Sequence, residues 1–85
     1  MKTLFVLMKC ALGKAEEVGN AIVDLGIEGV EVYSITGPYD LLVKAHFADV
    51  EEIADTVQDK LHRVPGVLDT NTFVSFRMYG HYSVF

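Results

Sequence analysis

The sequence predicts an α+β fold in which two strand–helix–strand units form one four-stranded antiparallel sheet with both helices on one face. Three observations lead to this prediction. The chain has 85 residues, which suits one domain with one core. Four apolar, β-rich segments are interspersed with two segments of helical period. A short turn between the second and third apolar segments makes a hairpin of them.

The first unit begins with a continuous apolar run at residues 3–10 (TLFVLMKC), which is predicted to be a strand. Residues 14–26 follow a helical period, with two glutamates in the first turn and a glycine at the end. Residues 29–36 are predicted to be the second strand. The apolar face of the helix comprises Ala15, Val18, Ala21, Ile22 and Leu25.

A tight turn at Gly37-Pro38-Tyr39-Asp40 is predicted next, because proline at the second position presets the backbone of a β-turn. Residues 41–47 (LLVKAHF) then form the third strand, antiparallel to the second.

The second helix is expected to begin at Asp49, whose side chain caps it while Glu52 reaches back in a capping box. Pro65-Gly66 ends the helix, and residues 67–77 form the fourth strand. The predicted apolar face comprises Val50, Ile53, Ala54, Val57 and Leu61. The resulting order, strand-helix-strand twice, predicts the ferredoxin-like arrangement, with the first and third strands in the middle of the sheet.

Both central strands are apolar on both faces, which is typical of strands that are covered on both sides. In the first strand, Phe5 and Leu7 oppose the apolar set that begins at Leu4, and in the third strand Leu42 opposes the set that begins at Leu41. Two helices cover one face only, so the sequence predicts a homodimer packed sheet to sheet. The alternative is that the second face stays hydrated through Lys9, Lys44 and His46.

The charge balance excludes several classes of partner. The net charge is −5, and the seven lysines and arginines form no cluster, so neither direct nucleic-acid binding nor binding to an anionic membrane is expected. No apolar run is long enough for a signal peptide or a membrane span. The single cysteine, Cys10, excludes an internal disulfide and fits a reducing compartment, so a cytoplasmic location is expected.

No catalytic or metal-binding constellation is recognisable. His46, His62 and His81 lack metal-ligand spacing, and Cys10 has no histidine partner, so neither a metal nor a cofactor is expected. The turn at residues 37–40 is the strongest local signal, with two interpretations. Asp40 either accepts N–H bonds within its own turn, or the turn offers backbone donors, an aromatic ring and a carboxylate that together hold a zwitterion.

Residues 32–44 (VYSITGPYDLLVK) resemble the core motif of the Lrp/AsnC effector-binding domain, also called the RAM domain. The first strand with its following loop resembles the opening of that family, and residues 49–76 resemble its second helix, Pro-Gly-Val stop and last strand. The resemblance covers residues 3–76. Such domains have a ferredoxin-like fold, dimerise through their sheets and often join into rings of eight or ten chains.

The resemblance also implies a ligand and partners. Family members bind amino acids or related metabolites between dimers, close to the turn, which assigns ligand binding to Gly37, Tyr39 and Asp40 and, on the facing strand, to Thr70 and Thr72. Full-length members carry an N-terminal helix-turn-helix that binds DNA. Because residue 1 almost directly begins the first strand, this chain looks like a stand-alone version whose partners include full-length regulators.

The aromatic end of the chain departs from this pattern, which is expected to stop near Phe76. We therefore divide the chain into a ligand-binding and oligomerisation domain (residues 1–77) and a tail (residues 78–85). The tail adds a strand, covers a neighbouring chain or plugs the ligand pocket.

The resulting functional prediction is a non-enzymatic module that binds an amino-acid-type effector, oligomerises and modulates transcription indirectly. One alternative is a small cofactor-free enzyme of the dimeric α/β-barrel type, a monooxygenase or an isomerase. That enzyme would need His46, Tyr33 or Asp40 to converge in a cavity. Another alternative is assembly without any ligand.

Overall fold

The computed structural model describes residues 2–80; residues 81–85, which include His81 and most of the predicted tail, lie outside the described residues. The described part contains β1 (Lys2–Cys10), α1 (Ala15–Asp24), β2 (Glu31–Ser34), β3 (Leu41–Phe47), α2 (Val50–Asp55), a π-helical segment η1 (Thr56–Leu61) and β4 (Val67–Ser75). Each predicted element is present, and the second and fourth strands are shorter than the sequence indicated.

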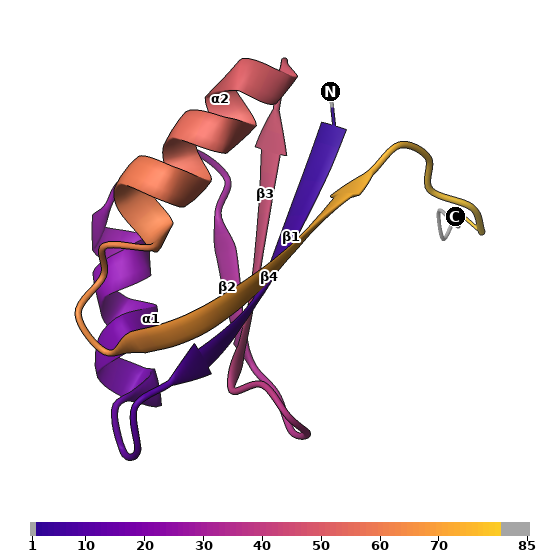
Figure 1. The fold of residues 1–85 in the computed structure, drawn as a ribbon. Coiled ribbons are helices and arrows are strands. Elements are labelled where there is room, and N and C mark those ends of the chain that lie inside the picture. Colours follow the sequence, from indigo (N-terminus) through magenta and orange to yellow (C-terminus); the bar gives the residue numbers. More distant parts are fainter. Residues whose placement is uncertain (1, 81–85) are drawn as a thin grey trace.

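The four strands form one antiparallel sheet in the order β2-β3-β1-β4. Both helices lie on the same face of this sheet, and the opposite face carries no element of the described chain (Figure 1). The predicted ferredoxin-like fold is therefore confirmed, including the central position of β1 and β3.

The core lies between the sheet and the helices, because alternate side chains of β1 and β3 point to the helical face. The register pairs Leu4 with Ala45, Val6 with Val43 and Met8 with Leu41, so the inward sets of the two strands face one another. The core consists of Leu4, Val6, Met8, Cys10, Leu41, Val43, Ala45 and Phe47 from the sheet, and of Val18, Ile22, Ile53, Val57, Leu61 and Val64 from the helices and the loop after them.

The predicted cap of the second helix is confirmed. Asp49 has an extended backbone, and its Oδ1 accepts a hydrogen bond from the Glu52 N–H at 3.0 Å. The Glu52 carboxylate reaches back to the Ala48 N–H at 3.4 Å, one residue before the position that a capping box uses.

The apolar face of this helix differs from the prediction, because Val50 and Ala54 are exposed. The buried residues Ile53, Val57 and Leu61 are spaced four apart, which exceeds the 3.6 residues of an α-helical turn. The chain widens to a π-helix from Thr56, with a 3.0 Å bond from the His62 N–H to the carbonyl of residue 57. The wider turn keeps the four-residue stripe facing the sheet.

The helical segment ends at Leu61, four residues before the predicted stop at Pro65-Gly66, and Gly66 directly precedes β4, where two features favour glycine. Its φ of +98° lies in the region that favours glycine, and a Cβ at this position would come within 2.9 Å of Val18 Cγ2. Its carbonyl also accepts a 2.8 Å bond from the Ala11 N–H. Gly66 therefore packs the start of β4 directly against α1.

Candidate ligand-binding site

The loop between β2 and β3 is longer than the predicted four-residue turn. It spans residues 35–40, is closed by a 3.0 Å bond from the Ile35 N–H to the Asp40 carbonyl, and has Gly37 at a φ of +108°. Pro38 and Gly37 are exposed, whereas Tyr39 and Asp40 are half-buried. The loop thus presents its glycine backbone to solvent and turns its last two side chains toward the sheet.

Asp40 joins this loop to β1. Its backbone N–H donates to the Met8 carbonyl at 2.8 Å, and its Oδ2 accepts from the Cys10 N–H at 2.8 Å. The register of β1 against β4 slips between Lys9 and Cys10, so the carboxylate serves an N–H at the irregular end of the strand. The Asp40 side chain therefore accepts a hydrogen bond from the neighbouring strand β1, and not from its own turn as one interpretation of the sequence held.

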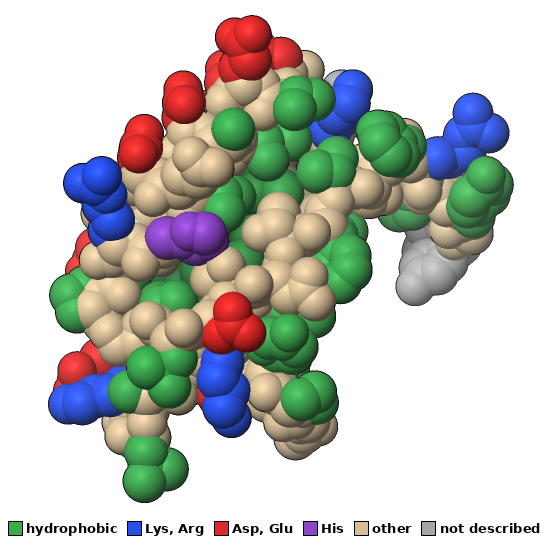
Figure 2. All heavy atoms as spheres, in the orientation of Figure 1, with side chains coloured by type: hydrophobic (Ala, Val, Ile, Leu, Met, Phe, Trp, Pro, Cys, Tyr) green, Lys and Arg blue, Asp and Glu red, His purple; other side chains and the backbone are tan. Residues whose placement is uncertain are grey.

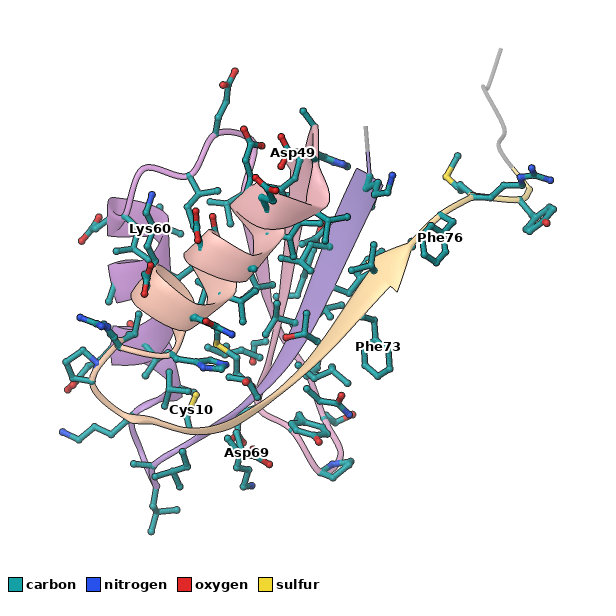
Figure 3. All side chains as sticks on the ribbon, turned by 45° about the horizontal axis from the view of Figure 1, so that its top comes forward. Cys10, Asp49, Lys60, Asp69, Phe73 and Phe76 are labelled. Carbon is teal, nitrogen blue, oxygen red and sulfur yellow. The ribbon has the colours of Figure 1, made fainter. Side chains whose placement is uncertain are left out.

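Opposite charges lie next to one another at this end of the sheet. Lys9 Nζ is 3.7 Å from Asp40 Oδ2, and the register places Asp69 of β4 directly opposite Lys9. Figure 3 shows Asp69 at the same end of the sheet as Cys10. A cation flanked by two carboxylates supplies both signs of charge that a zwitterion requires. Lys9 and Asp69 carry no motif in the sequence, and only the cross-strand register places Asp69 opposite Lys9, the partner of Asp40.

Cys10 fits the role of a small buried hydrophobe that its sequence context indicated. Its side chain is buried in the core. Burial first, and then the negative charge of Asp40, raise the pKa of the Cys10 thiol above its ordinary value. The thiol therefore stays protonated at neutral pH, which disfavours nucleophilic chemistry.

Thr70 and Thr72 lie on a different surface from Lys9 and Asp69. They pair with Met8 and Val6, whose side chains point to the helical face of the sheet. The Thr70 hydroxyl is 2.6 Å from Nε2 of His62, which follows η1. The structure thus groups Gly37, Tyr39 and Asp40 in one loop and places the two threonines one strand beyond β1, on the helical side of the edge strand.

The open face of the sheet carries a group of apolar side chains, and Lys9, Lys44 and His46, which the hydrated alternative named, lie on the same face. Phe5, Leu7 and Leu42 are half-buried, and Tyr33 and Phe73 are exposed. The register connects them, because Leu42 pairs with both Leu7 and Tyr33, and Phe5 pairs with Phe73. Figure 3 shows Phe73 projecting away from the helices. We call these five residues the open-face patch.

The groups that the enzyme alternative needs do not converge within one chain. His46 and Asp40 are six positions apart along and just before β3, which corresponds to about 20 Å at ~3.3 Å per residue. His46 Nδ1 is 3.2 Å from the Thr3 hydroxyl, and the Tyr33 hydroxyl donates to Glu31. Each group is thus engaged by its own strand neighbour.

Two cavities on the helical side of the sheet have no residue of loop 35–40 in their lining. One, of about 680 Å³, lies between the segment after α1 and the α2–η1 helix, and Glu28, Glu52, Asp55 and Asp59 are among its lining residues. Figure 2 shows acidic side chains along the outer side of α2. A second cavity, of about 420 Å³, lies between α1 and β2. Neither cavity is lined by residues of loop 35–40. A ligand bound at this loop would therefore lie on a surface that is open in a single chain.

The described residues contain neither a metal-binding cluster nor a membrane-spanning helix. Within residues 2–80, no three histidine, cysteine or acidic side chains are grouped so as to hold a metal ion, the acidic cavity included. The helices of the described chain are too short or too polar to span a membrane.

Comparison with known proteins gives a family match. The model of the Lrp/AsnC ligand binding domain matches residues 3–84. The match extends past Phe76, so the expectation that the family pattern stops there is wrong; the division at residue 77 remains a prediction. The HTH-type transcriptional regulator FL11 of Pyrococcus abyssi is 35% identical over 75 residues, which are 88% of this chain and 48% of that protein. The chain thus spans about half the length of this curated relative.

Solved structures agree with this match. The crystal structure of TTHA0845 from Thermus thermophilus has a TM-score of 0.84 and 40% sequence identity, and the alignment covers 95% of this chain and 100% of that chain. The complex of the transcriptional regulator NMB0573 of Neisseria meningitidis with L-methionine has a TM-score of 0.80. Its identity is 24%, with 94% of this chain and 53% of that chain covered, so it shows a shared fold.

Proposed function

We propose that this chain, which belongs to the Lrp/AsnC ligand-binding domain family, is a non-enzymatic module that binds an amino-acid-type effector and oligomerises. It acts on transcription indirectly, in the cytoplasm, through the regulators that it joins. The support for this role is that the curated relatives that match are HTH-type transcriptional regulators, and that the chain corresponds to about half of the length of FL11.

The observation that carries the ligand proposal is the position of Lys9 between Asp40 and Asp69 beside loop 35–40. An α-amino acid offers one carboxylate and one ammonium. The Lys9 ammonium and the exposed backbone around Gly37 suit the carboxylate, and the two aspartates suit the ammonium. Tyr39 supplies an aromatic ring at the same loop. Thr70 and Thr72 belong to the proposed site only if the ligand, or a neighbouring chain, also reaches the helical side of β4.

Oligomerisation follows from the open-face patch. Covering about 500 Å² of apolar surface, the size of the largest patch on a typical monomer, contributes roughly 12 kcal/mol before the cost of association. A homodimer stacked sheet to sheet achieves this cover, and rings of eight or ten chains would place the open ligand site between dimers. The site is then completed by a second chain, which accounts for its exposure in one chain.

The non-enzymatic part of the proposal rests on geometry and on relatives. His46 lies six positions from Asp40, and each of the candidate acid-base groups His46, Tyr33 and Asp40 is engaged by a neighbour. General acid-base catalysis requires such groups to converge on one substrate. The relatives found are transcriptional regulators.

A thermal-shift screen of the twenty amino acids tests the ligand proposal, with L-methionine included because a regulator of the same fold was solved with it. At ten times its dissociation constant, a ligand stabilises the fold by about 1.4 kcal/mol, which corresponds to roughly 6–11 °C for a domain of this size. Calorimetry on the hit then compares Lys9→Gln and Asp69→Asn with the control Lys60→Gln, which lies on η1.

Loss of binding in the first two variants and retention in the control would support the site. A hit that binds both site variants with unchanged affinity would remove Lys9 and Asp69 from it. No hit at millimolar concentrations would contradict amino-acid binding and leave assembly without a ligand.

A further inference from the structure

The chain continues beyond β4 as a short apolar arm, which we define as residues 76–80. Its large side chains are nearly fully exposed: Phe76 84%, Met78 70% and Tyr79 80%. Figure 1 shows that this arm leaves the sheet on the side away from the helices, where the open-face patch lies. Figure 2 shows hydrophobic side chains gathered along it. Three large apolar groups this close together in water are costly to leave uncovered.

We propose that the arm of one copy packs on edge strand β2 of a second copy of this chain, with Arg77 facing Glu31 and the apolar side chains next to Tyr33. This inference rests on the sheet-to-sheet dimer of the proposed function. The proposed dimer does not specify where the arm of each chain binds, and this inference assigns that place.

The reach of the arm suits a second copy stacked on the open face. Stacked sheets lie ~10 Å apart. Five residues extend over about 16 Å at ~3.3 Å each. An arm that starts at the end of β4 therefore crosses the gap between the sheets and reaches the level of the partner's sheet.

The strand order names the partner strand once the axis of the proposed dimer is taken parallel to the strands. Stacked sheets align their strands within about 30°. A two-fold axis parallel to the strands exchanges the two edges of the order β2-β3-β1-β4, so that β4 of one copy lies over β2 of the other. The same axis preserves the level along the strands. Ser75 lies level with His46 through Thr3, and Glu31 lies level with Lys44, so the start of the arm is offset from Glu31 by two residues, about 7 Å, along the strands.

The chemistry of the two surfaces is complementary. Glu31 and Tyr33 are both exposed on β2, and the Tyr33 hydroxyl donates to the Glu31 carboxylate, which holds that carboxylate outward at the edge. Arg77 is the cation of the arm, and the chain as a whole carries a net charge of −5. An arginine on a carboxylate and aromatic rings beside Tyr33 are the contacts that stabilise such an interface.

A charge-swap experiment tests the arm. Sedimentation over a concentration series gives the dimer dissociation constant for wild type, Arg77→Glu, Glu31→Arg and the double variant, with Arg63→Glu as a control on the helical side. We expect each single variant to raise the dissociation constant about tenfold or more. The double variant should restore it, and the control should leave it unchanged. Circular dichroism confirms that each variant is folded.

The outcomes separate the arm from the dimer. If wild type sediments as a monomer, the dimer of the proposed function fails, and the arm contact fails with it. If wild type is a dimer that tolerates both Arg77→Glu and deletion of residues 76–85, the arm proposal is overturned while the dimer stands. If deletion weakens the dimer but the double variant gives no rescue, the partner strand is not β2. If deletion instead strengthens ligand binding and leaves assembly unchanged, the arm covers the ligand site, and the proposal is again overturned.

Discussion

The Cys10 N–H donates a 2.8 Å hydrogen bond to Oδ2 of Asp40, a residue thirty positions away in the sequence. This bond ties the loop between β2 and β3 to the end of β1, where the register against β4 slips. It gives Asp40 a structural role in addition to any contact with a ligand.

Removing this carboxylate should destabilise the fold. Asp40→Ala leaves the part-buried Cys10 N–H without its acceptor, so we expect the free energy of unfolding to fall by about 1–3 kcal/mol in urea denaturation. Asp40→Asn retains a side-chain carbonyl and should cost less. Asp69→Ala is the matched control, because that exposed carboxylate accepts only from its neighbour Thr70. Equal stability of the alanine variants would contradict the role of Asp40.

The close approach at Gly66 makes a second prediction. Gly66→Ala introduces a Cβ at a φ of +98° and 2.9 Å from Val18 Cγ2, so the free energy of unfolding should fall by about 2–4 kcal/mol. Gly13→Ala has a similar positive φ but no atom within 4 Å of the new Cβ, and it should cost about 1–2 kcal/mol. Thermal and urea unfolding of both variants measure the difference. If the Gly66 variant were no less stable than the Gly13 variant, α1 would be able to move away from the new Cβ without loss of folding free energy, and the prediction would be wrong.

Two leucines seven positions apart test the π-helical stripe. Leu61 is 1% exposed and Leu68 is 66% exposed. Leu61→Ala should lower the free energy of unfolding by about 2–5 kcal/mol, because it leaves a cavity between η1 and the sheet. Leu68→Ala should change it by less than about 0.5 kcal/mol. A small effect at Leu61 would mean that the helix does not face the sheet as described.

The buried thiol predicts a pH dependence. Burial raises the pKa of Cys10 above its ordinary value of 9.0. The folded state therefore holds this proton more tightly than the unfolded state. The resulting stabilisation is complete below pH 9, and it falls as the pH rises from 9 through the folded-state pKa.

The measurement is the free energy of unfolding of wild type and of Cys10→Ala between about pH 7 and pH 10.5. We expect the difference between the two to be constant up to about pH 9 and then to move against wild type. Parallel curves over the whole range would show that the thiol titrates alike in both states. Tyr33, whose pKa is raised mainly by its hydrogen bond to Glu31, is present in both proteins and cancels in the comparison.

Local patterns were sufficient for most of the fold. The cap at Asp49 and the order of strands and helices were predicted because each depends on residues close together in the sequence, whereas the second helical segment ends at Leu61, before the predicted stop at Pro65-Gly66. The predicted apolar face of the second helix was wrong in part. Val50 and Ala54 of α2 are exposed, and the buried residues Ile53, Val57 and Leu61 are spaced four apart, the last two in the π-helical segment η1.

The candidate site was predicted less completely. The loop with Gly37, Tyr39 and Asp40 can be recognised in the sequence. Lys9 and Asp69 carry no motif, because they lie on two different strands, β1 and β4, and are brought together only by the pairing of those strands. Thr70 and Thr72 alternate onto the helical face, and this assignment requires the pairing with Met8 and Val6.

The sequence by itself determined the elements, the family and the apolar character of both sheet faces, because these follow from periodicity and from short motifs. Only the tertiary structure decided that the Asp40 carboxylate is bound to Cys10, that Lys9 lies between two aspartates and that the arm leaves on the open side. Each of these depends on the register and direction of the strands. A register shift of one residue moves a side chain to the opposite face of the sheet.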